Sequence, residues 1–186
     1  MNMPTLQVVF SVLHAGGKFG GQGYKISGGL HGVGASVVNA LSEWLEVTIC
    51  SEGKVYKQRY ERGNTIYKLK VVGECDIEKT GTSVTFLPDK EIFEETVFEF
   101  NTLKTRLREM AFLTKGLRIV LRDLREEEVI EKEFHYEGGI KEFVQYLNHS
   151  KTALYDDIIY CEGTKDDVYV EVAFQHNDSF TENVYS

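Results

Sequence analysis

The chain has little cysteine, proline and tryptophan. It holds three cysteines, two prolines and one tryptophan in 186 residues. Cys50, Cys75 and Cys161 are far apart and odd in number, which excludes zinc-site spacing and disfavours a dense disulfide framework. The cysteines are therefore predicted to be three buried or half-buried thiols in a reducing compartment. The scarcity of proline, together with the lack of low-complexity tracts, argues against long disordered segments.

Long hydrophobic runs are also missing. No apolar stretch approaches the ~18 residues that a membrane helix needs. The first five residues, Met1 to Thr5, contain no basic region followed by an apolar core, so no export signal is evident. The sequence therefore predicts a cytoplasmic location and no membrane partner.

An excess of basic charge is absent as well. Lys and Arg number 21 against 29 Asp and Glu, which gives a net charge of −8. This balance disfavours a surface whose main task is to grip DNA phosphates, although a subunit whose DNA contacts lie elsewhere is compatible with it. The length predicts one domain, or one domain plus part of another.

Glycine, in contrast, is concentrated in one place. Nine of the 17 glycines lie between Gly16 and Gly34, and the run ends in Gly29-Leu30-His31-Gly32-Val33-Gly34. Glycine lets the backbone approach a ligand closely, and free amides at the start of a helix form an anion site. The segment is predicted to be a phosphate-binding loop, with residues 18–28 as an attached mobile flap.

Hydrophobic periodicity predicts a mixed fold. Helices are expected over 4–13, 34–41, 103–111 with Asn101 as N-cap, and 140–147, and strands over 45–50, 55–61, 66–72, 82–87, 117–122, 129–136, 158–161 and 168–175. Gly138-Gly139 is read as a boundary. Helices and antiparallel strands in this order predict an α+β or two-layer α/β fold, because the regular strand–helix alternation of a doubly wound sheet is missing.

The common glycine-rich phosphate loops do not fit the run. Lys18 is followed by Phe19, so the P-loop pattern is absent. The dinucleotide-binding fingerprint needs a strand before the loop, and the protein-kinase loop lies within a hairpin, whereas here a helix and a long flap come first.

A longer ordered string carries a more specific resemblance. Leu13 to Phe19 and Tyr24 to Ser42 resemble the ATP-binding lid of the GHKL ATPases and, within them, the B subunits of bacterial type II topoisomerases. Shorter matches at 79–82, 86–89, 106–109 and 134–140 extend the resemblance over essentially the whole chain. The stretches 24–27 and 136–140 are more similar to the gyrase branch than to the topoisomerase IV branch.

The resemblance implies a two-layer α/β sandwich of the GHKL (Bergerat) type over residues 1–136, with the ATP lid at 15–34. Residues 137–186 would begin a transducer domain similar to ribosomal protein S5. The family's cofactors are ATP and Mg²⁺. Its partners are the A subunit of the topoisomerase, DNA and a second copy of the B subunit, which joins on ATP binding.

The same resemblance implies an ATP-binding set: Lys18, Tyr24, Gly29, Leu30, His31, Gly32, Val33, Gly34 and Thr82. The loop from Gly29 to Gly34 would wrap the triphosphate, the Lys18 ammonium and the Tyr24 hydroxyl would reach phosphate, and Thr82 would line the adenine end. Each side chain also has a plainer interpretation. His31 could only fill the loop, Lys18 could be a solvated charge, Tyr24 could pack the flap, and Thr82 could simply begin a strand.

In the family, the general-base glutamate, the Mg²⁺-binding asparagine and the adenine-reading aspartate lie upstream of the lid, and this chain has no match to them. No catalytic residue or metal ligand is therefore assigned here. The sequence is expected to be an internal fragment that does not turn over ATP alone. A catalytically dead nucleotide-binding or interaction module stays open as an alternative if Met1 is a true start.

Overall fold

The computed structural model describes residues 3–15, 31–166 and 168–185. The chain divides into two compact units, Met1–Val97 and Phe98–Ser186. The domain boundary predicted at 136/137 falls inside the second unit and stays a prediction. The predicted α+β class is confirmed, since helices and antiparallel sheets occur in both units.

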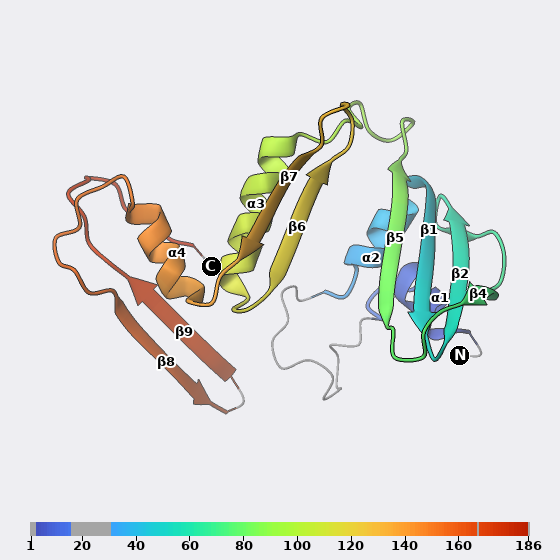
Figure 1. Cartoon of the computed structure of the whole chain (residues 1–186), viewed down its shortest axis with the longest axis horizontal. Helices are drawn as coiled ribbons and strands as arrows, with labels where there is room; N and C mark the ends of the chain where they lie inside the picture. Colours follow the sequence, from blue (N-terminus) through green and yellow to red (C-terminus); the bar gives the residue numbers. More distant parts are fainter. Residues whose placement is uncertain (1–2, 16–30, 167, 186) are drawn as a thin grey trace. The chain divides into compact units, whose positions relative to one another are not determined.

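The first unit is a sheet covered on one face by helices (Figure 1). Its elements are α1 (Thr5–Ser11), α2 (Gly34–Ala40), β1 (Ser42–Ser51), β2 (Lys54–Glu61), β3 (Asn64–Thr65), β4 (Lys70–Glu74) and β5 (Gly81–Pro88). The strand order is β3-β2-β1-β5, with β4 also paired to β2, and all of these pairs are antiparallel. The two layers are those predicted from the sequence.

Strand periodicity explains the core of this unit. Alternate residues of β1 point to one face, so Leu45 and Val47 are both fully buried there, and Tyr60 lies directly opposite Leu45 on β2. Phe10 of α1 stacks on Tyr60 with ring centroids 5.9 Å apart. Burial raises the pKa of Tyr60 to about 12, and its hydroxyl donates a 2.9 Å hydrogen bond to Gln58 Oε1.

A buried amide joins the helical layer to the sheet. Asn39 of α2 is 1% exposed, and its Nδ2 donates to Phe10 O at 2.8 Å and to Gly63 O at 3.4 Å. Gly63 has φ +80°, and a Cβ added there would lie 3.4 Å from the Cα of Ala40. The turn between β2 and β3 therefore needs glycine both for its backbone conformation and for its approach to α2.

A buried carboxylate fixes the chain after β5. Asp89 is 2% exposed and accepts a 2.6 Å hydrogen bond from Arg62 Nε and a 2.9 Å bond from the backbone N–H of Glu91. Its own N–H donates to Leu41 O at 3.1 Å. The Glu91 N–H and the Arg62 guanidinium hold the pKa of Asp89 below its ordinary value.

The second unit combines helices with two separate hairpins (Figure 1). It contains α3 (Phe100–Leu113), β6 (Arg118–Asp123), β7 (Ile130–His135), α4 (Gly139–Asn148), β8 (Ile159–Lys165) and β9 (Val168–Phe174). Helix α3 packs on the β6–β7 hairpin and on α4, which contacts β9. Phe112 of α3 is 1% exposed, and its ring centroid lies 3.6 Å from that of Tyr136, 5.0 Å from Phe143 and 5.4 Å from Tyr146.

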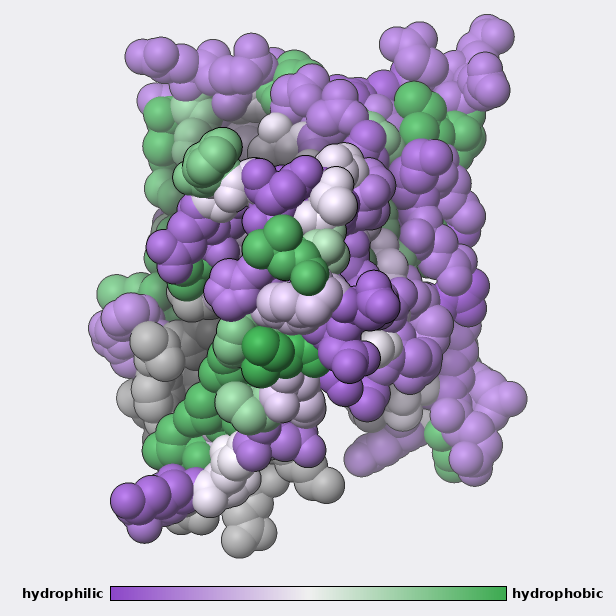
Figure 2. Space-filling view, turned by 90° about the vertical axis from the view of Figure 1, so that its left-hand side faces the viewer, coloured by the Kyte–Doolittle hydropathy of each residue, from purple (hydrophilic) through white to green (hydrophobic). Residues whose placement is uncertain are grey.

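The β8–β9 hairpin has two different faces. One carries the exposed side chains of Ile159, Val168, Val170, Val172 and Phe174; Figure 2 views the chain from this end, where hydrophobic (green) and hydrophilic (purple) surfaces adjoin. On the other face Glu162 lies directly opposite Glu171. The hydroxyl oxygen of Tyr160 is 2.7 Å from a carboxylate oxygen of each, which offsets part of their repulsion.

Several element predictions are wrong in detail, among them the strand expected over 158–161, which is β8 (Ile159–Lys165). The strand expected over 66–72 is wrong at 66–69, where the chain is irregular and Tyr67 O accepts a 3.3 Å hydrogen bond from Gln58 Nε2; only its end lies in β4, which begins at Lys70. The first helix ends at Ser11 rather than at 13. The N-cap of α3 is Glu99, and the Asn101 side chain instead accepts a 3.0 Å bond from Lys104 Nζ.

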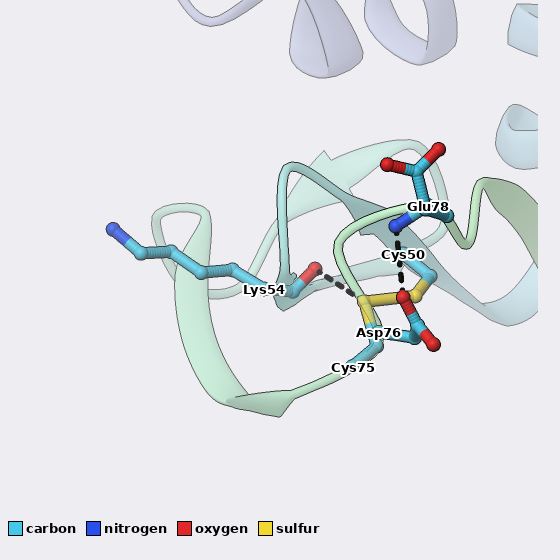
Figure 3. The surroundings of a disulfide bond; sticks show 5 residues. All are labelled: Cys50, Lys54, Cys75, Asp76 and Glu78. Carbon is cyan, nitrogen blue, oxygen red and sulfur yellow. Dashed lines mark hydrogen bonds between the residues drawn. A yellow bond between two sulfur atoms is a disulfide. The ribbon is translucent and has the colours of Figure 1, made fainter.

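The prediction of three buried or half-buried thiols is also wrong. Cys50 and Cys75 form a disulfide with a Cα–Cα distance of 6.5 Å (Figure 3), and Cys161 is a free, exposed thiol. Cys50 pairs with Val55 at the β1–β2 turn, and β4 pairs with the same end of β2. Strand pairing thus brings together two cysteines that are 25 residues apart in sequence.

Candidate functional site

Two glycines shape the backbone at the start of α2. Gly32 has φ 60°, Val33 is the N-cap residue and Gly34 begins the helix. Apart from its chain neighbours and the backbone of α2 itself, no described heavy atom lies within 4 Å of the position that a Cβ on Gly34 would take. The first amides of a helix lack partners within the helix, so they remain available to an acceptor. The predicted phosphate-loop residues His31 to Gly34 therefore fit close contact between backbone and anion.

Two local hydrogen bonds hold this turn. Ser36 Oγ donates to Val33 O at 3.0 Å. His14 Nδ1 lies 2.9 Å from His31 O, which ties the residues after α1 to the residues before α2. Sequence reasoning gave His14 no role, although it lies within the stretch that carries the family resemblance. Its contact with His31 depends on how α1 and α2 sit side by side on the sheet, which a local pattern does not reveal.

Thr82 lies on the helix-covered side of the sheet. It is the second residue of β5 and pairs directly with Ile49 of β1. Ile49 packs against the core cluster, as does Ala35 of α2. Directly opposite residues of an antiparallel pair point to the same face, so Thr82 shares a face with the first turn of α2. It is exposed, because β5 is the last strand of the sheet order.

The surface next to Thr82 on this face is apolar. Val84 lies opposite Val47, and Phe86 lies opposite Leu45. Both β5 side chains are exposed, at 43% and 39%, whereas their β1 partners are fully buried. A flat apolar group could lie here beside the Thr82 hydroxyl, which is the chemistry that a nucleotide base needs.

The remaining predicted ligands lie outside the described residues. These are Lys18, Tyr24, Gly29 and Leu30. The structure therefore places five of the predicted residues, His31, Gly32, Val33, Gly34 and Thr82, within one unit, and their role toward a nucleotide stays a prediction. Within ranges 3–15, 31–166 and 168–185, no three His, Cys, Asp or Glu side chains gather as a metal site would require. None of the helices described there is long and apolar enough to cross a membrane.

Comparison with known proteins gives one consistent result. A family model described as DNA gyrase B matches residues 139–186. The B subunit of DNA gyrase from Halalkalibacterium halodurans is 58% identical over 100% of this chain. The chain belongs to the family of type II topoisomerase B subunits. The B subunit of DNA topoisomerase 4 from Streptococcus pneumoniae, another member of this family, is 54% identical over the same extent.

The fold agrees with the family. The crystal structure of the 43K ATPase domain of Thermus thermophilus gyrase B, in complex with an aminocoumarin, matches with a TM-score of 0.77 and 37% identity, covering 96% of this chain and 44% of that one. The fold is therefore that of a GHKL ATPase, as the sequence predicted. The chain spans 29% and 28% of the length of the two type II topoisomerase B subunits compared with it.

Proposed function

We propose that this chain is part of the ATP-binding region of a gyrase B subunit, which couples ATP hydrolysis to DNA strand passage and supercoiling. The observation that carries the proposal is the 58% identity with a gyrase B subunit over the whole chain. The match to a gyrase B ATPase domain supports it. On this proposal the working protein is cytoplasmic, uses ATP with Mg²⁺, and acts with the gyrase A subunit, DNA and a second B subunit.

In this proposal the backbone from Gly29 to Gly34 holds the triphosphate of ATP. The N–H groups at the start of α2 donate to phosphate oxygens, and Lys18 and Tyr24 add a charge and a hydroxyl. Thr82 holds the base end beside the apolar surface of β5. When bound, ATP supplies the energy-rich phosphoanhydride whose cleavage drives the conformational cycle. We assign no Mg²⁺ ligand to this chain, because the family's Mg²⁺-binding asparagine lies upstream of the lid and has no counterpart in this sequence.

The first test is ATP binding by the purified chain, which tryptophan fluorescence or calorimetry can measure. Replacing Thr82 with Ala removes one side-chain hydrogen bond and should weaken ATP binding by roughly three- to tenfold. Ser83→Ala is the matched control, because Ser83 is the neighbouring hydroxyl on the opposite face of β5. Equal effects of the two substitutions would contradict the assignment of Thr82.

The second test is turnover. We propose that the chain alone does not hydrolyse ATP, since the family's general base and metal-binding asparagine have no counterpart in it. A steady-state ATPase assay should show no activity above buffer, and turnover comparable to that of an intact B subunit would overturn this proposal.

We also propose that residues 1–136 belong to the ATPase domain and residues 137–186 to the transducer.

Topoisomerase IV is the second candidate, because a subunit of that enzyme is 54% identical over the whole chain. A chimera decides between them. The matching segment of the Halalkalibacterium halodurans gyrase B subunit is replaced by this chain, and supercoiling is measured with the A subunit of that enzyme. The proposal predicts that supercoiling is retained. If the chimera loses ATP hydrolysis altogether, the alternative of a catalytically dead module is favoured.

A further inference from the structure

We propose that Cys50 and Cys75 are a reversible redox pair that controls the order of the backbone leading into Thr82. The effect of this redox pair on ATP binding rests on the proposed function, whereas its effect on the order of residues 76–82 does not. The oxidised form is the disulfide in the structure, and the reduced form is a dithiol. The partner chemistry is a small thiol and its disulfide, of the glutathione class.

The position of the bond carries the argument. Cys50 pairs with Gly81, the first residue of β5, and the next pair along the ladder is Ile49 with Thr82. Cys75 precedes β5 by only a short connection, residues 76–80. The disulfide and the Cys50–Gly81 pairing therefore close a small loop that contains residues 75–81. Thr82 is the first residue after this loop. With the bond intact, the start of this connection is covalently fixed to β1, in addition to the hydrogen bond from the Cys75 N–H to Gly53 O.

The connection has few other restraints. Within it, Asp76 Oδ1 accepts a 2.9 Å hydrogen bond from the N–H of Glu78 (Figure 3). The N–H of Lys79 donates to Asp76 O at 3.0 Å. Both bonds are local and exposed. The Ile77 side chain is 73% exposed, so it adds little burial. Opening the disulfide therefore removes the main covalent restraint on this segment.

The pair is also arranged to form again after reduction. The ladder from β1 to β2 and β5 holds Cys50 without help from the bond. Cys75 N–H donates to Gly53 O at 3.0 Å, and the Cys75 sulfur lies 3.5 Å from Lys54 O (Figure 3). Both cysteines are half-buried, so a small thiol can reach them. Backbone pairing would keep the two sulfurs close in the dithiol form.

The chemistry is thiol–disulfide exchange. A glutathione thiolate attacks one sulfur and breaks the S–S bond, which forms a mixed disulfide and leaves the other cysteine as a thiolate that takes up a proton. A second glutathione thiolate attacks the mixed disulfide, releases oxidised glutathione and leaves the second cysteine as a thiol after protonation. Oxidised glutathione reverses both steps.

The test compares the chain in reduced and in oxidised glutathione buffers. After glutathione is removed, the Cys161→Ser variant should take up no maleimide in the oxidised state and two maleimides in the reduced state, at Cys50 and Cys75. Hydrogen exchange of the amides in 76–82 should accelerate on reduction by roughly tenfold or more, as expected from losing the restraint of a closed loop. The Cys161→Ser variant keeps this response. Cys50→Ser and, independently, Cys75→Ser remove it and exchange rapidly in both buffers.

Unchanged labelling, or equal exchange of 76–82 in the two buffers, would overturn the redox pair. An ATP titration in the same two buffers separates this result from the proposed function. Weaker binding in the reduced state, by about fivefold or more, is the coupling expected between two linked sites. Absence of ATP binding in both states contradicts the proposed function, whereas the exchange data still decide the redox pair.

Discussion

Asp89 shows how one residue can join three parts of the first unit. It follows β5, accepts hydrogen bonds from Arg62 after β2 and from the Glu91 backbone, and donates its own N–H to Leu41 at the end of α2. Arg62 also lies 2.9 Å from a Glu91 carboxylate oxygen. These hydrogen bonds and the ion pair with Arg62 depend on the charge of the buried carboxylate. Protonation of Asp89 should therefore lower the free energy of unfolding of the unit.

The sign of this pH dependence follows from the lowered pKa of Asp89. Above its ordinary value of 3.8 the carboxylate is charged in both states, and its full contribution to stability is present. As the pH falls further, the unfolded chain binds the proton first, and this contribution is lost. Asp89→Asn should therefore lower the urea midpoint at pH 7 and flatten its decline between pH 4 and pH 2.

The control for this experiment is Glu94→Gln, which removes an exposed carboxylate from the same stretch of chain. It should leave the urea midpoint at pH 7 nearly unchanged. If both variants decline with acid as steeply as the original chain, the role assigned to Asp89 is incorrect.

At the scale of elements, local patterns predicted more than pairing did. Alternation over 45–50 predicted β1, and the strand predicted over 55–61 matches β2, because such signals are contained in a few neighbouring residues. The strand expected over 66–72 is only partly present, because the chain is irregular before β4 begins at Lys70, and the β2–β4 pairing itself contains an irregularity between Val55 and Tyr56. The face on which Thr82 lies and the disulfide between Cys50 and Cys75 also depend on strand pairing, so local patterns did not predict them.

The turn between β2 and β3 offers a test at this scale. Gly63→Ala places a side chain at φ +80° and against Ala40 of α2. The free energy of unfolding should fall by more than about 1 kcal/mol. Gly81→Ala is the matched control within the same unit, because a Cβ there meets no atom within 4 Å. Urea denaturation measures both variants, and an equal loss would show that the backbone of Gly63 is not the cause.

At the scale of the whole molecule, the two units have separate cores. The first is built on Leu45, Val47 and Tyr60, and the second on Phe112 and its aromatic neighbours. Each core is formed within its own unit, so each unit has its own source of cooperativity.

Thermal unfolding should accordingly show two transitions. Leu45→Ala should lower only one of them, with a cost of about 2–5 kcal/mol, and Phe112→Ala only the other, with about 3–5 kcal/mol. Met110→Ala, at a side chain that is 54% exposed on α3, should shift neither by more than about 0.5 kcal/mol. Calorimetry measures all three, and a single transition that moves with both core variants would contradict separate units.

The place of β5 at the end of the strand order has a practical consequence for this chain in solution. An edge strand offers its outer backbone groups as a template on which another chain can pair, and β5 carries exposed Val84 and Phe86 beside them. The isolated polypeptide should thus oligomerise as its concentration rises, and a lysine in place of Val84 should raise its solubility limit.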